Sequence, residues 1–299
     1  MKDLVDLHLH SNCSDGSYPP AEVIRRVAEV GLRAAAICDH DMVDGTDEAL
    51  QAGQEYGVEI LAGVELSVVW ENYQDIHLLG YCFDHHHPEL KSALQEFCDF
   101  RRNRNVLIVE RVNAKLQSEG RAPLSVAKVQ ARAAGAIGRP HIAMELVEQG
   151  HVAEAEAAFK RYLVPCNVEK RFFPIDEAIT LLHQAGGIAV LAHPPFISSD
   201  RKVIAGMLDQ FVELGLDGVE AYNSGGSNND IDWAITEARQ RRLIVTGGSD
   251  FHGDSKGDIS IGKGRGNLKI PYSCVEDIQT VVARRAHEKS VDEKPDVSR

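Results

Sequence analysis

The feature that most constrains this chain is a set of nine histidines and carboxylates placed where apolar segments end. Each segment is hydrophobic over several residues and then stops at a side chain of a type that binds metal ions. Strands joined in a barrel or an α/β sheet bring their ends to one rim, so these side chains would meet there. Buried imidazoles and carboxylates are costly without partners, and divalent metal ions would supply those partners. The nine residues are His8, His10, Asp15, His40, Glu65, His77, His193, Asp250 and His252.

The pattern between these residues predicts strands that mostly alternate with helices. In the first strand the apolar residues Val5, Leu7 and Leu9 are expected on one face and the polar residues between them on the other. Seven strands of this kind favour an α/β barrel or a doubly wound sheet. Strands are expected at 3–10, 34–38, 58–68, 75–83, 187–194, 216–222 and 242–252, and helices at 19–30, 45–56, 175–185, 201–214 and 229–241.

One connection departs from this alternation. Residues 69–74 are too few for a parallel crossover, which takes about a dozen residues or more. We therefore expect strands 58–68 and 75–83 to be antiparallel neighbours. Glu65 lies late in the first of them and His77 early in the second, so the pairing would bring both side chains to the same end of the sheet.

Residues 85–165 differ from the rest, because they carry helical patterns and no strand signal. The region has 12 Lys and Arg against 9 Asp and Glu, a net charge of +3, which leaves −16 for the remainder of a chain at −13. We interpret it as a helical insertion that covers the barrel mouth, between barrel segments at 1–84 and 166–283. The polar residues 284–299 are expected to form a flexible tail. Helices in the insertion are expected near 88–119, 123–134, 140–149 and 153–162.

Composition excludes several classes of protein. The net charge of −13 argues against a protein that coats extended duplex DNA through a basic surface. The longest apolar runs fall short of the roughly 18 residues that a membrane span needs. The N-terminus does not have the form of a signal peptide, and the six scattered cysteines are typical of reduced thiols. We therefore expect a cytoplasmic protein with neither a membrane nor duplex DNA as a partner.

Each of the nine residues also has a structural alternative. The His8–His10 pair could be a half-exposed strand face, Asp15 an ordinary Asp-Gly turn, and Glu65 a salt-bridged residue. The joint pattern is stronger, because five separate strand ends carry ligand types. Nitrogen and oxygen ligands without a thiolate suit Zn, Mn or Fe rather than Ca or Mg. Nine ligands are too many for one ion, and a cluster of ions suits phosphoryl transfer to water.

The motifs, in order H-x-H, Asp15, D-H, Glu65, His77, A-H-P and S-D-F-H, resemble the polymerase-and-histidinol-phosphatase (PHP) family over residues 3–84 and 165–273. The resemblance implies a distorted seven-stranded (β/α)7 barrel, PHP-like, with a trinuclear metal site. It implies that His8, His10, Glu65 and Asp250 hold a first ion, that Glu65, His77 and His193 hold a second with Glu65 bridging, and that Asp15, His40 and His252 hold a third.

The chain length, the helical insertion and the turn at 138–141 resemble one subgroup of that family. Its members are called 3′,5′-nucleoside bisphosphate phosphatases and 5′→3′ exoribonucleases acting on short 5′-phosphorylated RNA. The resemblance implies a metal-dependent phosphohydrolase that removes the 3′-phosphate from nucleoside 3′,5′-bisphosphates, degrades short 5′-phosphorylated RNA, or both. It implies two or three divalent transition-metal ions, with manganese as the first choice and zinc or iron fitting the same ligands.

Further basic and polar residues are candidates for binding a nucleotide or a short RNA. Arg139 and His141 lie at a predicted helix start, where free N–H groups and a guanidinium suit a phosphate, although a solvated helix start is the alternative. Arg101 and Arg104 belong to a basic stretch that could equally be a solvated helix face. The other candidates are Lys170 and Arg171, where the chain re-enters the barrel, and Tyr222, Asn223 and Ser224, which could contact a base or ribose, although Tyr222 could simply pack.

Three other functions stay open at this point. A phosphatase of another small phosphate ester, such as histidinol phosphate, is disfavoured by the basic insertion. A non-catalytic metal-binding module of a polymerase assembly is disfavoured by the complete ligand set and by a chain of only 299 residues. An amidohydrolase is disfavoured because no lysine stands at a strand end with the ligands. The run His85-His86-His87 is interpreted as a polar loop.

Overall fold

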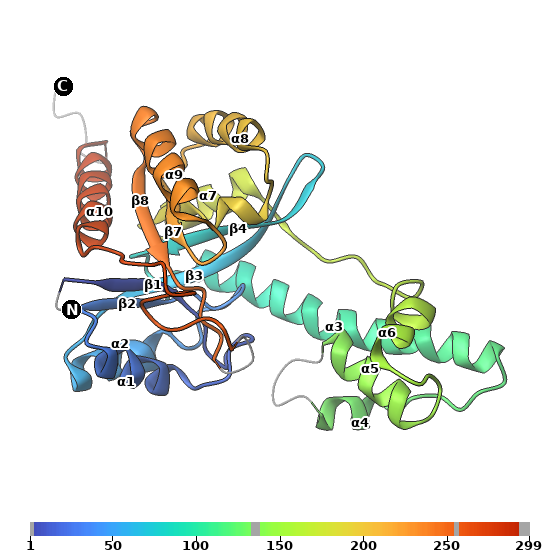
Figure 1. The fold of residues 1–299 in the computed structure, drawn as a ribbon. Helices are drawn as coiled ribbons and strands as arrows, with labels where there is room; N and C mark the ends of the chain where they lie inside the picture. The colour runs from blue at the N-terminus through green and yellow to red at the C-terminus, as the bar shows by residue number, and fades with distance from the viewer. Residues whose placement is uncertain (1–2, 133–137, 254–256, 293–299) are drawn as a thin grey trace, which may run out of the picture. The chain divides into compact units, whose positions relative to one another are not determined.

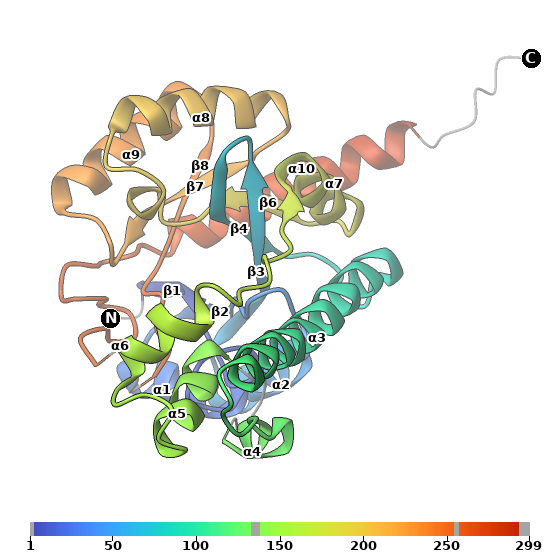
Figure 2. The same cartoon turned by 90° about the vertical axis from the view of Figure 1, so that its right-hand side faces the viewer.

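The computed structural model describes residues 3–132, 138–253 and 257–292 (Figures 1 and 2). The chain forms two compact units: residues 1–92 with 172–299, here called the barrel unit, and residues 93–171, here called the helical unit. Both boundaries lie later than the predicted 85 and 165. His85 lies 2.8 Å from Asp47 of the barrel unit, and Arg104 of the helical unit donates to the returning segment at Asn167 and Val168. That the insertion covers the barrel mouth stays a prediction.

One sheet organises the barrel unit. Its strand order is β1-β2-β3-β4-β6-β7-β8, and the short β5 pairs with β3 outside this path. Seven strands of this path were predicted, and β5 was not, because two residues carry no periodic signal. The strands are β1 (Val5–Leu9), β2 (Ala34–Ile37), β3 (Glu59–Trp70), β4 (Tyr73–Tyr81), β5 (Phe173–Pro174), β6 (Ile188–Leu191), β7 (Gly218–Asn223) and β8 (Ile244–Gly248).

The strand β4 runs against both of its neighbours. It is antiparallel to β3 and to β6, while β1, β2 and β3 and then β6, β7 and β8 pair in parallel. The prediction from the short connection at 69–74 is therefore confirmed. Glu65 is opposite Leu79, and His77 is opposite Ser67. Glu65 and His77 are thus diagonal neighbours on one face of the pair, close enough for their side chains to meet.

The two end strands of the sheet approach each other and almost close it into a barrel. The amide of Asp250 donates to His8 O at 2.9 Å, and the amide of His10 donates to Phe251 O at 2.9 Å. Gly248 permits this approach, because a Cβ there would lie 2.0 Å from the Cβ of His8. The predicted distorted α/β barrel is confirmed.

A bulge in β1 changes which residues face the barrel interior. Asp6 and Leu9 are three positions apart, yet they pair with residues of β2 that are two positions apart. Such an extra residue reverses the alternation of faces beyond it. Val5 and Leu7 accordingly pack in a cluster that contains Cys38, whereas Leu9 packs in a different cluster. The prediction that Val5, Leu7 and Leu9 share one face was wrong at Leu9.

Helices cover the outside of the barrel sheet. Those that follow β1 and β2 pack together against these strands, as Figure 1 shows, and their apolar residues share one buried cluster with Leu9. Pro20 opens the first helix, which was predicted at 19–30, and Gly31, in a left-handed conformation, ends it. The helices of this unit are α1 (Pro20–Val30), α2 (Thr46–Tyr56), α7 (Ile175–Gln184), α8 (Arg201–Glu213), α9 (Asn228–Gln240) and α10 (Ser273–Asp292).

The predicted tail at 284–299 was wrong for residues 284–292, which continue α10. Val275 and Ile278 of this helix are fully buried in the barrel core. Near its end the guanidinium of Arg285 donates to the carboxylate of the buried Asp217. These tertiary contacts hold a segment whose composition is polar. Residues 293–299 lie outside the described part of the chain.

The regular elements described in the helical unit are all helices, and they share a core of their own. That core gathers Ile108, Val112 and Ile142 around the fully buried Tyr162. Within the described residues, no helix has the length and apolar content needed to cross a membrane. The elements are α3 (Pro88–Ser118), which begins in the barrel unit, α4 (Val126–Ala131), α5 (Arg139–Glu148), α6 (Ala155–Ala158) and a π-helix (Phe159–Leu163). The predicted helix at 123–134 extends into residues 133–137, outside the described residues.

Candidate metal centre

The carboxylate of Glu65 lies at the centre of the nine predicted ligand residues. This side chain is buried in the barrel unit, on the long strand β3. Five imidazoles approach its two oxygens. Oε2 lies 3.3 Å from His8 Nε2, 3.3 Å from His10 Nε2 and 3.2 Å from His40 Nδ1, and Oε1 lies 2.8 Å from His77 Nδ1 and 3.0 Å from His193 Nε2.

Asp250 approaches the same group from the end of β8. Its Oδ1 lies 3.2 Å from His10 Nε2 and 3.8 Å from His8 Nε2. The Nε2 atoms of His8 and His10 are 3.1 Å apart. These contacts place Asp250 next to the group of ligand atoms formed by His8, His10 and Glu65.

Asp15 gathers a second set of imidazoles beside the first. Its Oδ1 lies 3.3 Å from His252 Nε2 and 3.6 Å from His10 Nδ1, and its Oδ2 lies 3.9 Å from His40 Nε2. All nine predicted residues are therefore brought together by contacts within the barrel unit. His10 and His40 each belong to two of the sets of closely spaced ligand atoms in this cluster.

Two of these side chains project from unusual backbone conformations. His193 has φ 26° and Asp250 has φ 58°, in the left-handed region that residues with a Cβ seldom adopt. Hydrogen bonds hold both, since the His193 amide donates to Glu220 and the Asp250 amide donates to His8 O. Such strain concentrates at functional sites, where the surrounding structure enforces it.

Glu220 is a site residue that sequence reasoning missed. It is fully buried on β7, and its Oε1 lies 2.9 Å from His8 Nδ1 while its Oε2 accepts from the His193 amide at 2.9 Å. A carboxylate at Nδ1 places the imidazole proton there and leaves Nε2 as a free ligand atom. A charged residue inside the apolar strand segment 216–222 was the signal that could have identified it.

Two other buried aspartates fix the loops that carry ligands. Asp39 accepts from the amide and hydroxyl of Ser11 and from the hydroxyl of Ser14, so it orders the loop that leads to Asp15. Asp6 accepts from the amide of Ser249 at 2.8 Å, directly before Asp250. Burial raises the pKa of Asp6 to about 6, although this hydrogen bond opposes the change.

Charges inside the cluster shift its protonation equilibria in opposite directions. Burial would lower the pKa values of His8 and His10, but neighbouring carboxylates raise the pKa of His8 well above its usual range and that of His10 to about 9. Burial would raise the pKa values of the acids, but the imidazoles hold the pKa values of Glu65, Asp15 and Asp250 below their usual range. The cluster thus stabilises ionised carboxylates beside protonated His8 and His10, whereas burial lowers the pKa of His40 to about 3. Cations could replace the protons of His8 and His10.

The donor set fits metal ions. Among the described residues, several buried polar atoms lack a hydrogen bond, and four of them gather here: His10 Nδ1, His40 Nδ1, His193 Nδ1 and Glu65 Oε2. Buried polar atoms without partners are costly, and a metal ion satisfies such atoms. Three groups of ligand atoms, all within 4.8 Å of one another, occur in the cluster: His10, Asp15, His40 and His252; His8, His10 and Glu65; and His40, Glu65 and His77.

Comparison with known proteins agrees with this arrangement. The model of the PHP domain family matches residues 6–164. A protein of Haemophilus influenzae named 5′-3′ exoribonuclease is 36% identical over 273 residues, which are 90% of this chain and 96% of that protein. The chain belongs to the PHP domain family. The family predicted from the motifs is therefore confirmed.

Two further similarities extend over most of the PHP chain. A 3′,5′-nucleoside bisphosphate phosphatase of Chromobacterium violaceum is 31% identical over 262 residues, 86% of this chain and 90% of that one. A solved structure from Bifidobacterium adolescentis, described as a metal-dependent phosphoesterase, has a TM-score of 0.73 and 28% identity and covers 92% of this chain and 95% of that chain. The predicted class, a hydrolase of phosphate esters, agrees with these descriptions.

The predicted phosphate-binding residues between 101 and 171 belong to the helical unit and not to the barrel unit. Arg139 is the first residue of α5, and its guanidinium lies 5.8 Å from the Phe159 ring. His141 accepts the Gly138 amide through Nδ1, so it caps this helix start. The side chain of Arg101 lies outside the described part of the structure.

The other basic candidates in the helical unit have structural contacts. Arg104 is buried and donates to Val168 O at 2.7 Å and to Asn167 Oδ1 at 3.0 Å, so it ties two segments of the unit together. Arg171 pairs with Glu96 at 3.1 Å and is exposed, as is Lys170. Arg104 therefore has a structural role, whereas the exposed residues remain candidates for substrate contact.

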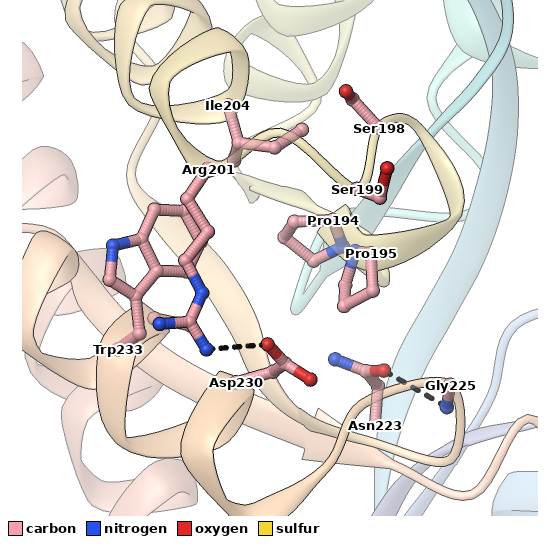
Figure 3. Close-up of a pocket in the computed structure, with 11 residues that line it drawn as sticks. Pro194, Pro195, Ser198, Ser199, Arg201, Ile204, Asn223, Gly225, Asp230 and Trp233 are labelled. Carbon is pink, nitrogen blue, oxygen red and sulfur yellow. Dashed lines mark hydrogen bonds and ion pairs between the residues drawn. The ribbon is translucent and has the colours of Figure 1, made fainter.

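The candidates at the end of β7 differ from one another. Tyr222 is half-buried against the hydrophobic cluster that contains Cys274. Ser224 is buried and donates to Ser249 O at 2.6 Å. Asn223 is buried too, but it lines a pocket of about 260 Å³ beside the PHP metal centre (Figure 3). Of the three, Asn223 alone lines this cavity.

Proposed function

We propose that this PHP protein is a metal-dependent phosphohydrolase that removes the 3′-phosphate from nucleoside 3′,5′-bisphosphates, degrades short 5′-phosphorylated RNA from its 5′ end, or does both. The observation that carries the proposal is the convergence of nine ligand-type side chains around Glu65. The names of relatives at 31% and 36% identity support the choice of substrates.

The cluster would hold two or three divalent ions. His8, His10, Glu65 and Asp250 would hold the first, Glu65, His77 and His193 the second, and Asp15, His40 and His252 the third. Distances of 2.8–3.9 Å between facing ligand atoms support these sets. Manganese is our first choice, and zinc or iron suits the same imidazole and carboxylate ligands. When bound, such ions polarise phosphoryl oxygens and increase the acidity of water.

Both proposed substrates undergo hydrolysis at the same kind of bond. The oxygen of water bonds to phosphorus, the bond between phosphorus and O3′ breaks, and O3′ receives a proton. In a bisphosphate the phosphoryl group leaves as free phosphate, and in RNA it stays on O5′ of the next nucleotide. Glu220 serves this reaction by fixing the ring of His8, so that its Nε2 faces the cluster.

The basic residues of the helical unit would bind the phosphate that does not react. Arg139 opens α5, where free N–H groups and the helix dipole favour an anion. A guanidinium adds two parallel donors for phosphate oxygens. Residues 85–165 carry a net charge of +3 in a chain at −13, which supports phosphate binding by this region.

We also infer a cytoplasmic location, with a nucleotide or a short RNA as the only kind of nucleic-acid partner. In the described part of the chain the six cysteines form no disulfide, and three of them are buried, which suits a reducing compartment. A chain at −13 is poorly suited to extended duplex DNA.

A phosphate-release screen with added Mn²⁺ tests the proposed function. The substrates are adenosine 3′,5′-bisphosphate, adenosine 5′-monophosphate, histidinol phosphate and a short 5′-phosphorylated RNA, the last followed by release of mononucleotides. We expect the bisphosphate, the RNA or both to react with the highest kcat/KM. The Asp250→Ala variant serves as the inactive control. Preference for histidinol phosphate, or no hydrolysis of any ester, would contradict the proposal.

A further inference from the structure

Phe196 is an exposed aromatic residue beside the metal centre. It ends the 3₁₀ turn Pro194–Phe196 that follows β6, and 59% of its surface is exposed. Among the described residues of the barrel unit, the other large hydrophobic side chain with comparable exposure is Tyr56, at 39%. Single exposed apolar side chains are common on proteins, so the exposure of Phe196 alone carries no argument. Its place does, because the ring is in contact with the imidazole of His193 in the ligand cluster.

Two contacts fix the position of the Phe196 ring. Its centroid lies 5.1 Å from that of the His193 imidazole, with the planes tilted by 57°. The ring also lies against Gly225, where an added Cβ would come within 2.5 Å of the ring. The Phe196 ring therefore packs on Gly225 and contacts His193, which is a proposed metal ligand.

A pocket adjoins this ring through Gly225, which lines the pocket and lies against Phe196. Figure 3 shows Pro194 and Pro195 across the opening from Trp233 and Asp230. The Arg201 guanidinium lies 5.4 Å from the Trp233 ring and pairs with Asp230 at 2.7 Å. The walls are thus proline rings, an indole and a guanidinium that an ion pair holds in place.

The pocket shares its wall with the metal centre. Pro194 directly follows His193, and Asn223, which lines the pocket, donates to the backbone oxygen of Glu220. Glu220 in turn contacts both His8 and His193. A group bonded to a phosphorus atom at the metal centre could therefore reach the pocket from within the barrel unit.

The shape and chemistry of this pocket suit a nucleobase. Its volume of about 260 Å³ is slightly below the roughly 300–1,000 Å³ of most small-molecule pockets, so it suits one flat ring system. Bases stack on aromatic rings and on guanidinium planes, and such stacking tolerates every base. Ser198 and Ser199 also line the pocket and could contact the edge of a base.

We propose that Phe196 and this pocket bind the base of the second nucleotide of an oligonucleotide substrate. The inference rests on the proposed function, in which the same P–O3′ bond breaks in a bisphosphate and in RNA. The two substrates differ in the group on that phosphorus, because only RNA carries a second nucleotide there through O5′. A base subsite next to the metal centre would therefore promote the hydrolysis of RNA and leave a bisphosphate without a contact in the pocket.

The test compares two substrates across four proteins. The kcat/KM values are measured with added Mn²⁺ for the 5′-phosphorylated dinucleotide of adenosine and for adenosine 3′,5′-bisphosphate. The proteins are the wild type, Phe196→Ala, the conservative Phe196→Trp, and Tyr56→Ala as the exposed-aromatic control. Loss of one stacking contact is expected to lower the ratio of dinucleotide to bisphosphate kcat/KM about fivefold to a hundredfold in Phe196→Ala.

Phe196→Trp should restore the ratio, because an indole also stacks, and Tyr56→Ala should leave it unchanged. An unchanged ratio in Phe196→Ala, whether both rates fall together or neither falls, would overturn the inference. The same holds if the wild type hydrolyses the bisphosphate but not the dinucleotide, and the proposed function would survive either result. A wild type inactive on both substrates would instead refute the proposed function, and the base subsite with it.

Discussion

Replacing Glu220 with glutamine should weaken the metal centre while leaving the barrel folded. In the wild type Glu220 accepts from two donors, His8 Nδ1–H and the His193 amide, each at 2.9 Å. Glutamine has the same shape but a single acceptor oxygen. If that oxygen keeps the His193 amide, its NH₂ group faces His8 Nδ1 and forces the ring proton onto Nε2, the atom that would bind metal. If the oxygen turns to His8, two donors face each other at His193.

The structure gives the size of this effect. One buried hydrogen bond to a charged group is lost in either orientation, which is worth about 1.5–3 kcal/mol, or roughly a ten- to hundredfold change. Replacing a hydrogen-bond partner of a metal ligand usually costs about 10–100-fold in metal affinity or activity, which agrees. Metal affinity is measured by competition with a chelator, and kcat by phosphate release with added Mn²⁺.

Glu59→Gln is the matched control, because Glu59 is a barrel carboxylate that also has two partners, Tyr272 and Gln279. It should lower stability without changing metal affinity. Circular dichroism and thermal unfolding of both variants show whether the barrel persists. If Glu220→Gln binds metal and turns over substrate like the wild type, the assignment of His8 and His193 as ligands that Glu220 orients is wrong.

Three further predictions concern the cluster and the phosphate anchor. Asp250→Ala should reduce kcat by more than about 100-fold with an unchanged circular dichroism spectrum, and near-normal kcat with added Mn²⁺ would remove Asp250 from the ligands. Arg139→Ala should lower kcat/KM about ten- to a hundredfold for a 3′,5′-bisphosphate but not for an aryl phosphate, and equal losses would assign it a structural role. Because the pKa values of His8 and His10 are raised, to about 9 for His10, these rings hold protons near neutral pH in the metal-free protein. Metal binding at about pH 7.5 should therefore release about two protons per chain, and fewer above about pH 9, as calorimetry in buffers of different ionisation enthalpy would show; no buffer dependence would contradict these pKa shifts.

Local pattern predicted most of the barrel, but not the features that depend on its closure. The short connection at 69–74 was enough to predict that β4 is antiparallel to β3. The bulge in β1 was not predictable from local pattern, because it lies where His8 accepts from the amide of Asp250, which follows β8 some 240 residues away along the chain. The helix α10 was partly missed for a similar reason, since its polar end is held by the pair of Arg285 with Asp217.

The same distinction between local pattern and tertiary contacts applies to the candidate site. Most of the nine ligand-type residues were visible because they interrupt or end an apolar segment, and Asp15 lies in the polar turn that follows His10. Glu220 was missed because a carboxylate inside a strand reads as an exposed face until the neighbouring strands are known. The sequence did not predict the exposure of Phe196 or its packing on Gly225, because both depend on the turn after β6. Arg104 shows the reverse case, in which a basic residue that could bind substrate instead ties two segments together.

The central claim is that the nine side chains around Glu65 hold more than one metal ion and that these ions are required for activity. Elemental analysis of the full chain, purified without chelator and paired with phosphate release from a 3′,5′-bisphosphate, tests it most directly. We predict about two to three transition-metal equivalents per chain, loss of activity when a chelator removes them, and recovery when Mn²⁺ is returned. One equivalent or none in a protein with full activity would contradict the account.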